Sequence, residues 1–347
     1  MRSRSLFVVP LVLSLVVPAT LPAQTETDPE LTEWEVPWEG TRPRDPYVAP
    51  DGRVWFVGQA GHYVAVLDPE AGTFERFDLG DGVGPHNLVV DGQGVVWYTG
   101  NRQRHIGRLD PATGEIERFE VPHEAGRDPH TLVFDSGGDL WFTVQGGNLV
   151  GKLRTETGEM RLVEAPQAPG RGGQMTSSRP YGIVVDSQDR PWIALFNTNL
   201  IATVDPQSFE MKTFELPEGA RPRRLVLTSD DTVWYVDYAR GYLGRLEPAT
   251  GVVKEWPMPG GPDSRPYGMA VDADDRIWFV ETGIQPNRFV GFDPANEDFF
   301  SITEVESGGG AVRHMYYDEE TNTVWFGADT NTIGVAQLPP RRAATSF

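Results

Sequence analysis

Residues 85–99 read Pro-His-Asn-Leu-Val-Val-Asp-Gly-Gln-Gly-Val-Val-Trp-Tyr-Thr, and variants of this stretch recur along the whole chain of 347 residues. Each variant places a tryptophan inside a short apolar run, and these tryptophans are Trp55, Trp97, Trp141, Trp192, Trp234, Trp278 and Trp325. Successive members lie 42, 44, 51, 42, 44 and 47 residues apart. A seven-fold repeat of this length is typical of β-propellers, in which each repeat forms one blade.

Each repeat predicts four short β-strands. The first strand follows a proline and the second contains the tryptophan, with a turn rich in Gly and Asp between them. In the second repeat, a third strand is expected over 105–109 and a fourth over 115–121, joined by a tight turn at 110–114. The apolar segments have strand length and no helical periodicity. The sequence therefore predicts an all-β fold, a seven-bladed β-propeller of four-stranded blades.

The last repeat lacks a fourth strand of its own. After Trp325 the chain supplies a third strand over 332–338, and the segment that resembles the missing strand, Leu31–Pro37, lies at the other end of the sequence. We expect this N-terminal strand to complete the last blade by pairing with the strand that contains Ile333, because a closed ring leaves no open gap. The propeller is then expected over residues 31–338, between a short linker at 24–30 and a C-terminal tail at 339–347.

The first 23 residues have the pattern of a secretory signal peptide. Arg2 and Arg4 precede an apolar run from Leu6 to Val17, and a Leu-Pro-Ala sequence ends at Ala23. The apolar run is too short to span a bilayer. We therefore expect a protein that is secreted or periplasmic in a bacterium after cleavage, with no membrane span, and a monomer.

Composition excludes several classes of site and partner. The chain has no cysteine, which excludes disulfides, thiolate metal sites and a cysteine nucleophile. Its formal net charge is −20, and removal of the two positive charges of Arg2 and Arg4 with the signal peptide gives −22. A charge of this sign repels phosphate backbones, so nucleic acid is not an expected partner.

Candidate site residues gather on one face of the predicted ring. Because neighbouring strands of a blade are antiparallel, the entrances of the first strands and the ends of the second strands lie on the same face. The residues expected to open the first strands are Tyr47, His86, His130, Tyr181, Arg223, Tyr267 and Arg313, with Arg224 and His314 one step further. The residues expected after the second strands include Asn101, Gln145, Asp237 and Glu281. Such a funnel of convergent polar groups predicts a ligand-binding site.

Two chemical roles are expected at this mouth of the channel: a general base and a cation that binds oxygen atoms of the substrate. His86 and His130 are candidate general bases, because imidazole titrates near neutral pH. Arginines such as Arg223, Arg224 and Arg313 suit a substrate with carboxylate or carbonyl oxygens, which a guanidinium group can bind in bidentate fashion.

Two carboxylates at the same mouth are candidate metal ligands. Glu281 and Asp237 carry the hard oxygen atoms that Mg²⁺ prefers. Two other interpretations stay open. Glu281 pairs with Arg265 or Arg288 in one of them, and in the other Asp237 neutralises an arginine of its own blade, Arg223 or Arg224.

The repeated pattern resembles a known family. Pro-x-x-hydrophobic-x-x-Asp-x-x-Gly-x-hydrophobic-Trp-Phe-Thr, followed by Asn-x-Ile-Gly-Arg-Leu, is similar to the streptogramin B (virginiamycin B) lyases over residues 31–338. The resemblance implies a magnesium-dependent elimination that linearises a cyclic depsipeptide. It also implies a histidine base at the entrance of a late blade and a glutamate that helps to hold the metal. Tyr267 and Glu281 stand at these two positions, and Arg223 stands where a further histidine is implied.

These observations together predict a secreted lyase that cleaves an ester or glycosidic link next to an acidic C–H. The expected catalytic residues are His86, His130, Tyr267 and Arg223. The expected substrate-binding residues are Tyr47, Tyr181, Arg224, Asn101, Gln145, Arg313 and His314. The expected substrate is a small molecule, a peptide or an anionic glycan. The alternatives are a non-catalytic propeller that binds a ligand or glycan, and a calcium-dependent lactonase, which needs several carboxylates at the mouth.

Overall fold

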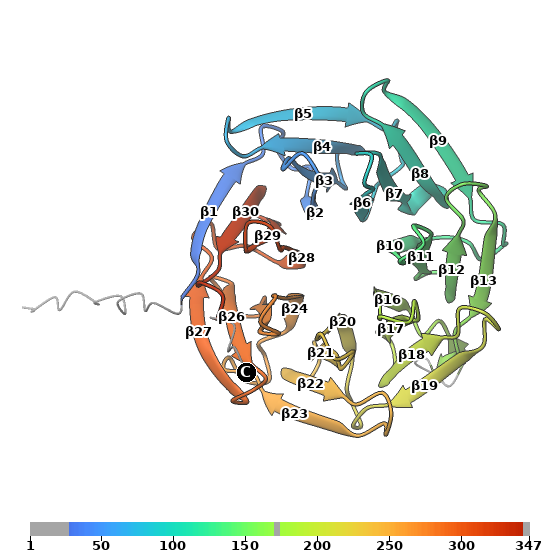
Figure 1. Ribbon diagram of the computed structural model, residues 1–347. Coiled ribbons are helices and arrows are strands. Elements are labelled where there is room, and N and C mark those ends of the chain that lie inside the picture. Colours follow the sequence, from blue (N-terminus) through green and yellow to red (C-terminus); the bar gives the residue numbers. More distant parts are fainter. Residues whose placement is uncertain (1–27, 170–173, 343–347) are drawn as a thin grey trace, which may run out of the picture.

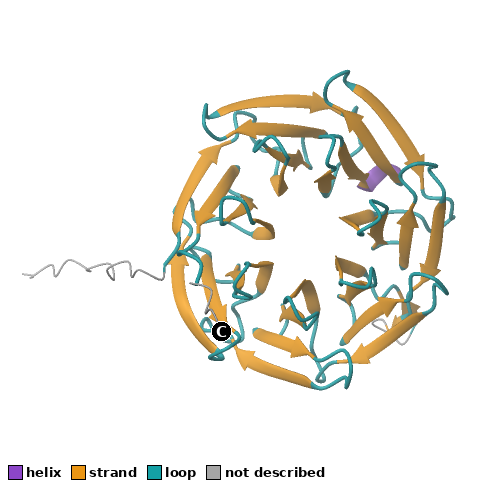
Figure 2. Cartoon of the chain, viewed as in Figure 1, coloured by secondary structure: helices purple, strands orange, loops and turns teal. Residues whose placement is uncertain are grey.

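The fold is a ring of seven four-stranded antiparallel sheets around a central channel (Figures 1 and 2). The computed structural model describes residues 28–169 and 174–342. The predicted signal peptide, most of the linker and the last five residues of the tail lie outside the described residues. The described part contains strands, turns and one three-residue 3-10 helix, Asn101–Gln103, and no helix long and apolar enough to cross a membrane. The predicted all-β seven-bladed propeller is confirmed.

Strands of the same rank occupy equivalent places in all blades (Figure 1). The innermost strands are β2 (Pro43–Val48), β6 (Leu88–Val90), β10 (Pro129–Phe134), β16 (Pro180–Val185), β20 (Pro222–Leu227), β24 (Pro266–Val271) and β28 (Val312–Asp318). The second strands are β3 (Val54–Gly58), β7 (Val96–Gly100), β11 (Leu140–Val144), β17 (Pro191–Leu195), β21 (Val233–Asp237), β25 (Ile277–Glu281) and β29 (Thr323–Ala328).

The outer half of each blade is formed by two further strands. The third strands are β4 (Tyr63–Asp68), β8 (His105–Asp110), β12 (Leu149–Leu153), β18 (Leu200–Val204), β22 (Tyr242–Leu246), β26 (Arg288–Asp293) and β30 (Thr332–Gln337). The outermost strands are β5 (Thr73–Asp78), β9 (Glu115–Glu120), β13 (Met160–Glu164), β19 (Met211–Glu215), β23 (Val253–Pro257), β27 (Asp298–Glu304) and β1 (Glu30–Glu35). A short ladder of β14 (Ala168–Pro169) and β15 (Met175–Thr176) lies between blades three and four.

The seventh blade combines strands from both ends of the chain. Its sheet has the order β1-β30-β29-β28, so that blue and red segments lie side by side in Figure 1. β1 runs antiparallel to β30 with Trp34 opposite Ile333, and the ring of Trp34 stacks on that of Trp325 at 5.6 Å between centroids. The Thr332 hydroxyl also donates a hydrogen bond to the Glu33 carboxylate, at 2.6 Å.

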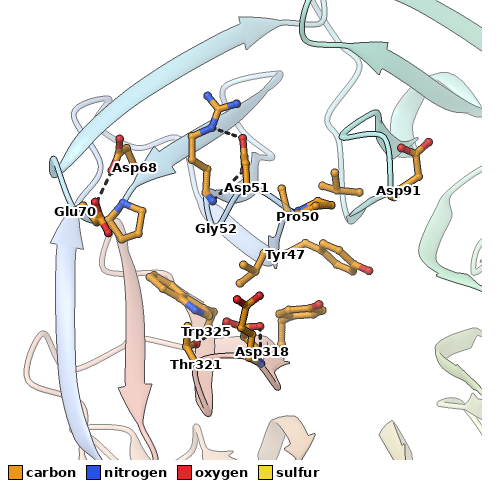
Figure 3. A pocket seen from close by; sticks show the side chains of 18 residues that line it. Tyr47, Pro50, Asp51, Gly52, Asp68, Glu70, Asp91, Asp318, Thr321 and Trp325 are labelled. Atoms are coloured by element: carbon orange, nitrogen blue, oxygen red, sulfur yellow. Dashed lines mark hydrogen bonds and ion pairs between the residues drawn. The ribbon is translucent and has the colours of Figure 1, made fainter.

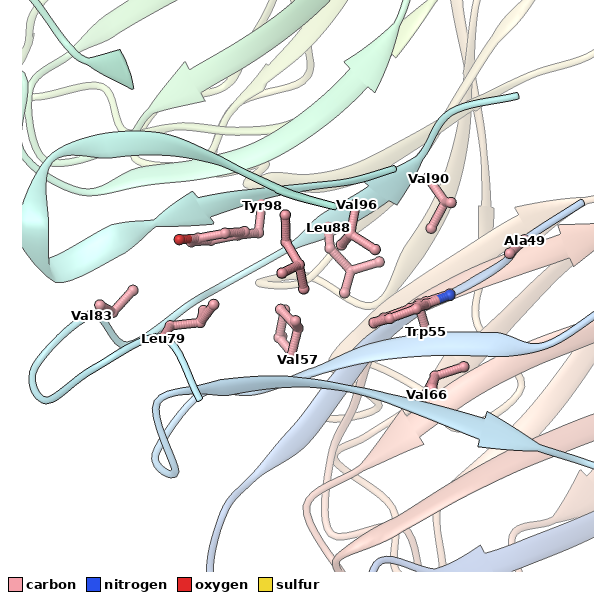
Figure 4. Packing of buried hydrophobic residues seen from close by; sticks show 12 residues of the cluster. Ala49, Trp55, Val57, Val66, Leu79, Val83, Leu88, Val90, Val96 and Tyr98 are labelled. Carbon is pink, nitrogen blue, oxygen red and sulfur yellow. The ribbon is translucent and has the colours of Figure 1, made fainter. Parts of the chain in front are cut away.

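The repeated tryptophans form the core between the blades. All seven are buried, and Trp55 packs against Leu88 and Val96 of the next blade (Figure 4). Trp325 of the seventh blade packs in the same way against Val54 of the first, so the apolar layer runs around the whole ring. Burial of roughly 200 Å² per indole at about 25 cal/mol per Å² contributes on the order of 5 kcal/mol each. A chain without disulfides is therefore held closed by its inter-blade contacts.

The glycine of the repeated Ile-Gly-Arg-Leu motif makes room for an aromatic ring. Gly107 on β8 lies under the ring of Tyr98 on β7, and a Cβ atom at Gly107 would approach the Tyr98 Cζ to 2.0 Å. The same relation holds for Gly151 and Phe142, where the distance would be 2.3 Å. The aromatic residue after the tryptophan and the glycine of the next strand thus form one packing unit.

The aspartate six residues before the tryptophan shapes the turn between the first two strands. In the fourth blade, Asp186 accepts hydrogen bonds from the backbone N–H groups of Gln188 and Arg190, at 2.9 and 3.0 Å. Its other oxygen accepts from the Trp192 indole N–H at 2.9 Å. One buried carboxylate therefore connects the turn to the inter-blade core.

We expect Asp186→Asn to lower the free energy of unfolding by about 1–3 kcal/mol, because the amide N–H₂ group would face the Trp192 N–H donor. Denaturant unfolding measures the loss. Asp298→Asn, a change of the same type at an exposed position, is the control and should stay within about 0.5 kcal/mol of wild type. Equal stability of Asp186→Asn and wild type would contradict this role of the turn.

Candidate functional site

Near their start, the innermost strands contain two residues that interrupt the register with the second strand. Six of the seven inner pairings show this irregularity, as between Pro129 and Leu132. The residues that directly follow the opening Pro43, Pro85, Pro129, Pro180, Pro222, Pro266 and Val312 form the mouth ring: Arg44, His86, His130, Tyr181, Arg223, Tyr267 and Arg313. In the first blade Arg44 is still in register with Val57, and the irregularity begins one residue later. The residues one position further along the chain form the inner ring: Asp45, Asn87, Thr131, Gly182, Arg224, Gly268 and His314. Contacts between non-neighbouring blades, such as Arg224 with Asp45, place both rings at the channel axis.

Tyr47 does not belong to the mouth ring, which corrects the prediction for the first blade. It lies opposite Trp55 in the strand register, three residues beyond Arg44. Its ring packs on that of Tyr316 at 4.3 Å between centroids, toward the other end of the channel. Arg44 and Asp45 take the two site positions of this blade, because Pro43 opens the strand and the later Pro46 lies within it.

Four aromatic side chains of the mouth ring form a continuous arc, which we call the aromatic arc: His86, His130, Tyr181 and Tyr267. The centroids of the two imidazole rings are 3.6 Å apart, and His130 lies 4.0 Å from Tyr181. The hydroxyl groups of Tyr181 and Tyr267 are hydrogen-bonded to each other. Residues from four blades thus become one contact chain, as the sequence predicted for this face.

The two histidines are buried, whereas their place in the repeat predicted bases at an open mouth. Burial lowers the pKa of both rings well below the ordinary value, and the positive charges of Arg44 and Arg224 lower it further. His86 Nδ1 lies 3.1 Å from the His130 backbone oxygen. His130 Nδ1 lies 2.9 Å from the Thr131 hydroxyl. The two neutral rings are therefore fixed in place, His130 beside Tyr181 and His86 on the other side of His130.

Arg223 is enclosed by aromatic rings. Its guanidinium carbon lies 3.9 Å from the ring centroid of Tyr267, 4.2 Å from that of Tyr238, 4.4 Å from Phe196 and 5.1 Å from Tyr181. We call these four side chains the aromatic cage. Within the described residues no carboxylate lies at ion-pair distance from Arg223, and its buried Nε has no hydrogen-bond partner. Contacts of this kind with electron-rich ring faces stabilise a cation.

Tyr267 has an unusual acidity for a buried phenol. Burial alone raises its pKa, but the guanidinium groups of Arg223 and Arg44 outweigh burial and lower the pKa of Tyr267 to about 8. Burial and the negative charge of Tyr267 raise the pKa of Tyr181, the neighbour that shares its hydrogen bond. Tyr267 is therefore the member of the pair that ionises, while Tyr181 keeps its proton.

The inner ring closes the channel beneath the arc. Asp45 accepts from Arg44 Nε at 3.1 Å and from Asn87 Nδ2 at 3.0 Å, and it pairs with Arg224 at 3.5 Å. Arg224 also donates to the Thr131 hydroxyl at 3.2 Å. Burial alone raises the pKa of Asp45, but Arg44 and other positive neighbours lower it to about 2. Arg224, predicted to bind substrate, is 4% exposed and braces four blades from within.

The remaining predicted binding residues lie around these two rings. Asn101 donates to the Pro129 backbone oxygen at 3.0 Å, and Gln145 accepts from Arg179 at 2.8 Å. Arg313 is half-buried, pairs with Asp329, and lies 5.6 Å from the Tyr267 ring centroid.

Glu281 and Asp237, the predicted magnesium ligands, are buried and already engaged by other groups of the protein. Glu281 is fully buried and accepts from Gly260 N at 2.6 Å and from Arg288 Nε at 2.8 Å. Asp237 pairs with Arg240 at 2.5 Å and accepts the Arg221 backbone N–H at 3.0 Å.

The donor set at these two carboxylates does not fit Mg²⁺, because both already hold a guanidinium group. Among the described residues, no group of three His, Cys, Asp or Glu side chains is arranged to hold a metal ion. The interpretation in which Glu281 pairs with Arg288 is the one that the structure bears out.

The larger cavities lie away from the aromatic arc. One of about 800 Å³ opens at the other end of the channel, where Tyr47 and Trp325 meet the acidic turns of neighbouring blades (Figure 3). Its aspartates are engaged in those turns: Asp51 with Arg53, and Asp68 with the backbone N–H of Glu70. These carboxylates serve to stabilise the hairpin turns.

A smaller cavity of about 260 Å³ lies inside the channel, beyond Arg224. It is lined by His314, Met269 and Met315 among others. His314, a predicted binding residue and a member of the inner ring, therefore lines this inner cavity, whose lining does not include Tyr267.

Fold and site together define a class: a seven-bladed propeller with a charged and aromatic cluster at one mouth of its channel. The sequence matches the virginiamycin B lyase family over residues 22–170 and 173–336. The chain belongs to this family.

Solved structures show how widely this fold is shared. Selenomethionine-substituted virginiamycin B lyase from Staphylococcus aureus is 23% identical, with 90% of this chain and 100% of that chain covered and a TM-score of 0.79. A catalytically inactive variant of that enzyme with quinupristin is 24% identical, with the same coverage and TM-score. Hydrazine synthase from Kuenenia stuttgartiensis is 15% identical, covers 90% and 98%, and has a TM-score of 0.71. At these identities the likeness shows the fold alone. No curated protein matches the chain.

Proposed function

We propose that this protein is a carbon–oxygen lyase that breaks an ester or glycosidic link by elimination next to an acidic C–H. The observation that carries the proposal is the pairing of Tyr267 with Arg223 at the mouth ring. An ionisable phenol and a cation lie within one cluster, 3.9 Å from ring centroid to guanidinium carbon. Elimination needs both a base and an electrophile for the carbonyl oxygen.

The reaction assigns one role to each group. The Tyr267 phenolate takes the proton from the carbon next to the carbonyl group, while Arg223 and Arg313 stabilise the negative charge that develops on the carbonyl oxygen. The electron pair of the C–H bond forms a carbon–carbon double bond, and the C–O bond breaks with its electrons on the departing oxygen. That oxygen takes up a proton, and Tyr267 returns its own to solvent. Tyr181 donates a hydrogen bond that holds the phenolate in place.

The exposure of these side chains indicates the order in which a substrate contacts them. Tyr267 is 2% exposed, whereas Arg223 and Arg313 are only half-buried. A substrate therefore meets the guanidinium groups first, and the phenol lies behind them. His130 is a positioning residue in this scheme, because its neutral ring packs on Tyr181, and His86 acts through its contact with His130.

The experiment is a product assay on cyclic depsipeptides and uronate oligomers in ¹⁸O-labelled water. Elimination gives a product with a new conjugated double bond, seen as ultraviolet absorbance, and no label. Label in the product would mean hydrolysis and would refute the lyase. Calcium-dependent lactonase chemistry is not proposed, since Asp237 and Glu281 already hold arginines.

A binding propeller without turnover is the second candidate. The burial of Tyr267 favours this candidate, because a buried phenol has little access to a substrate. The guanidinium group of Arg223 in its aromatic cage can still recognise a ligand without any reaction. Tight binding of a ligand with no product over long incubation would support this function in place of elimination.

We also propose that the protein is exported and acts as a monomer. The signal-like pattern of residues 1–23 supports export. N-terminal sequencing of the protein from a secreting host should begin at Gln24, and light scattering should give the mass of one chain.

A further inference from the structure

Arg223 is an unmatched charge in a protein rich in acids. The chain contains 50 Asp and Glu residues against 30 Lys and Arg. The other arginines of the two rings have carboxylate partners: Arg44 and Arg224 pair with Asp45, and Arg313 pairs with Asp329. Among the described residues Arg223 has aromatic faces instead.

The cage leaves the Nε donor of Arg223 unsatisfied among the described residues, although the Tyr181 hydroxyl also interacts with the guanidinium group. Ring faces stabilise the positive charge but accept no strong hydrogen bond from the guanidinium edge. The buried Nε has no partner within the described residues. A buried polar group of this kind is costly unless a partner satisfies it, and a carboxylate matches the planar donor fork of arginine.

Resting on the proposed function, we infer that the substrate carries a free carboxylate on the carbon that loses its proton, and that Arg223 neutralises this carboxylate in place of a metal ion. Glu281, which stands at the metal-binding position that the family resemblance implies, holds Arg288 and the Gly260 N–H. The electrophile is therefore a side chain of the protein, Arg223, and not a metal ion.

The chemistry points to 4-linked uronate glycans. In such a chain C5 bears both the carboxylate and the acidic proton, and the glycosidic oxygen leaves from C4. The C5 proton goes to the Tyr267 oxygen, the C5–H electrons form the C4–C5 double bond, and the C4–O electrons leave with the departing sugar, which takes up a proton. No oxidant or reductant is required.

The test compares oligogalacturonate with the same oligomer as its methyl ester. The ester has the more acidic C5–H, so a preference for the free acid must come from the binding site. We expect wild type to bind the free acid roughly 10- to 100-fold more tightly by calorimetry, as a charge-assisted contact implies. We also expect elimination of the free acid in the presence of EDTA.

Variants assign the preference to one side chain. Arg223→Met should remove the preference for the acid, and Arg223→Lys should keep part of it, because an ammonium group retains the charge without the fork. Arg221→Met is the matched control, an exposed arginine of the same connection, and should bind like wild type. Circular dichroism melting verifies that each variant is folded.

The outcomes separate the inference from the proposed function. Turnover that EDTA abolishes, or equal binding of acid and ester, would overturn the inference and leave the lyase intact. Binding of the acid that depends on Arg223, with no product from any substrate, would refute elimination and retain the carboxylate site.

Discussion

Replacement of Tyr267 by phenylalanine should lower the rate of elimination by about 10²–10⁴, the range for loss of a general base. The change removes one oxygen atom and keeps the ring that packs on Arg223, so folding and substrate binding should persist. Steady-state kinetics on a substrate that wild type converts, together with calorimetric binding, measure the two effects separately. We expect kcat to fall while Kd stays within a few-fold.

Tyr238→Phe is the matched control, because its ring also belongs to the aromatic cage, 4.2 Å from the guanidinium carbon. It should retain nearly full activity. An active Tyr267→Phe, or an equal loss in Tyr238→Phe, would show that the base is another group.

The pH profile gives an independent readout of the same base. The phenolate is the active form, and the pKa of Tyr267 is lowered to about 8. The rate of wild type should therefore rise with pH and level off above about 8. A histidine base with its ordinary pKa would reach the plateau more than one pH unit lower. Tyr267→Phe should lose the rise.

The sequence was sufficient for the architecture because every blade repeats the tryptophan, and most blades repeat the short-range chemistry around it. The aspartate of the turn, the tryptophan and the glycine of the third strand each have a local partner, as Asp186 with Trp192 and Gly107 with Tyr98 show. The seven tryptophans, with these local partners in most of the blades, define a ring before any long-range contact is known.

The site was predicted less well because a shift of one residue turns a strand side chain to the opposite face. The opening proline lies 12 residues before the tryptophan in six blades, and Pro43 has this spacing from Trp55 whereas Pro46 does not. That spacing was the available signal for Arg44 and Asp45. The polarity of the side chains near the start of each strand was the misleading signal.

The same shift explains the misplaced metal ligands. Asp237 and Glu281 stand three residues after their tryptophans, whereas Asn101, Gln145 and Tyr238 stand four residues after theirs. A constant spacing of four residues after the tryptophan would have indicated Tyr238, which is one of the four side chains of the aromatic cage. The convergence of this ring on Arg223 depends on how the blades meet, which no local pattern contains.

Glu281→Gln should cost about 3–5 kcal/mol in the free energy of unfolding, because it leaves the Arg288 guanidinium group without its charge partner beside a fully buried side chain. The two residues are directly opposite in the pairing of β25 with β26, so the loss falls within one hairpin. Denaturant unfolding measures it. Glu297→Gln, which breaks the exposed pair with Lys254, is the control and should cost no more than about 1 kcal/mol.

The double variant Glu281→Gln with Arg288→Met distinguishes a structural pair from a metal site. If the glutamate serves mainly to neutralise Arg288, removal of both charges should restore part of the stability lost in the single variant. A thermal shift caused by magnesium should be the same in wild type and in Glu281→Gln. If instead Glu281→Gln is as stable as wild type and loses a shift that wild type shows, then Glu281 binds the metal, and the electrophile at this mouth is not Arg223.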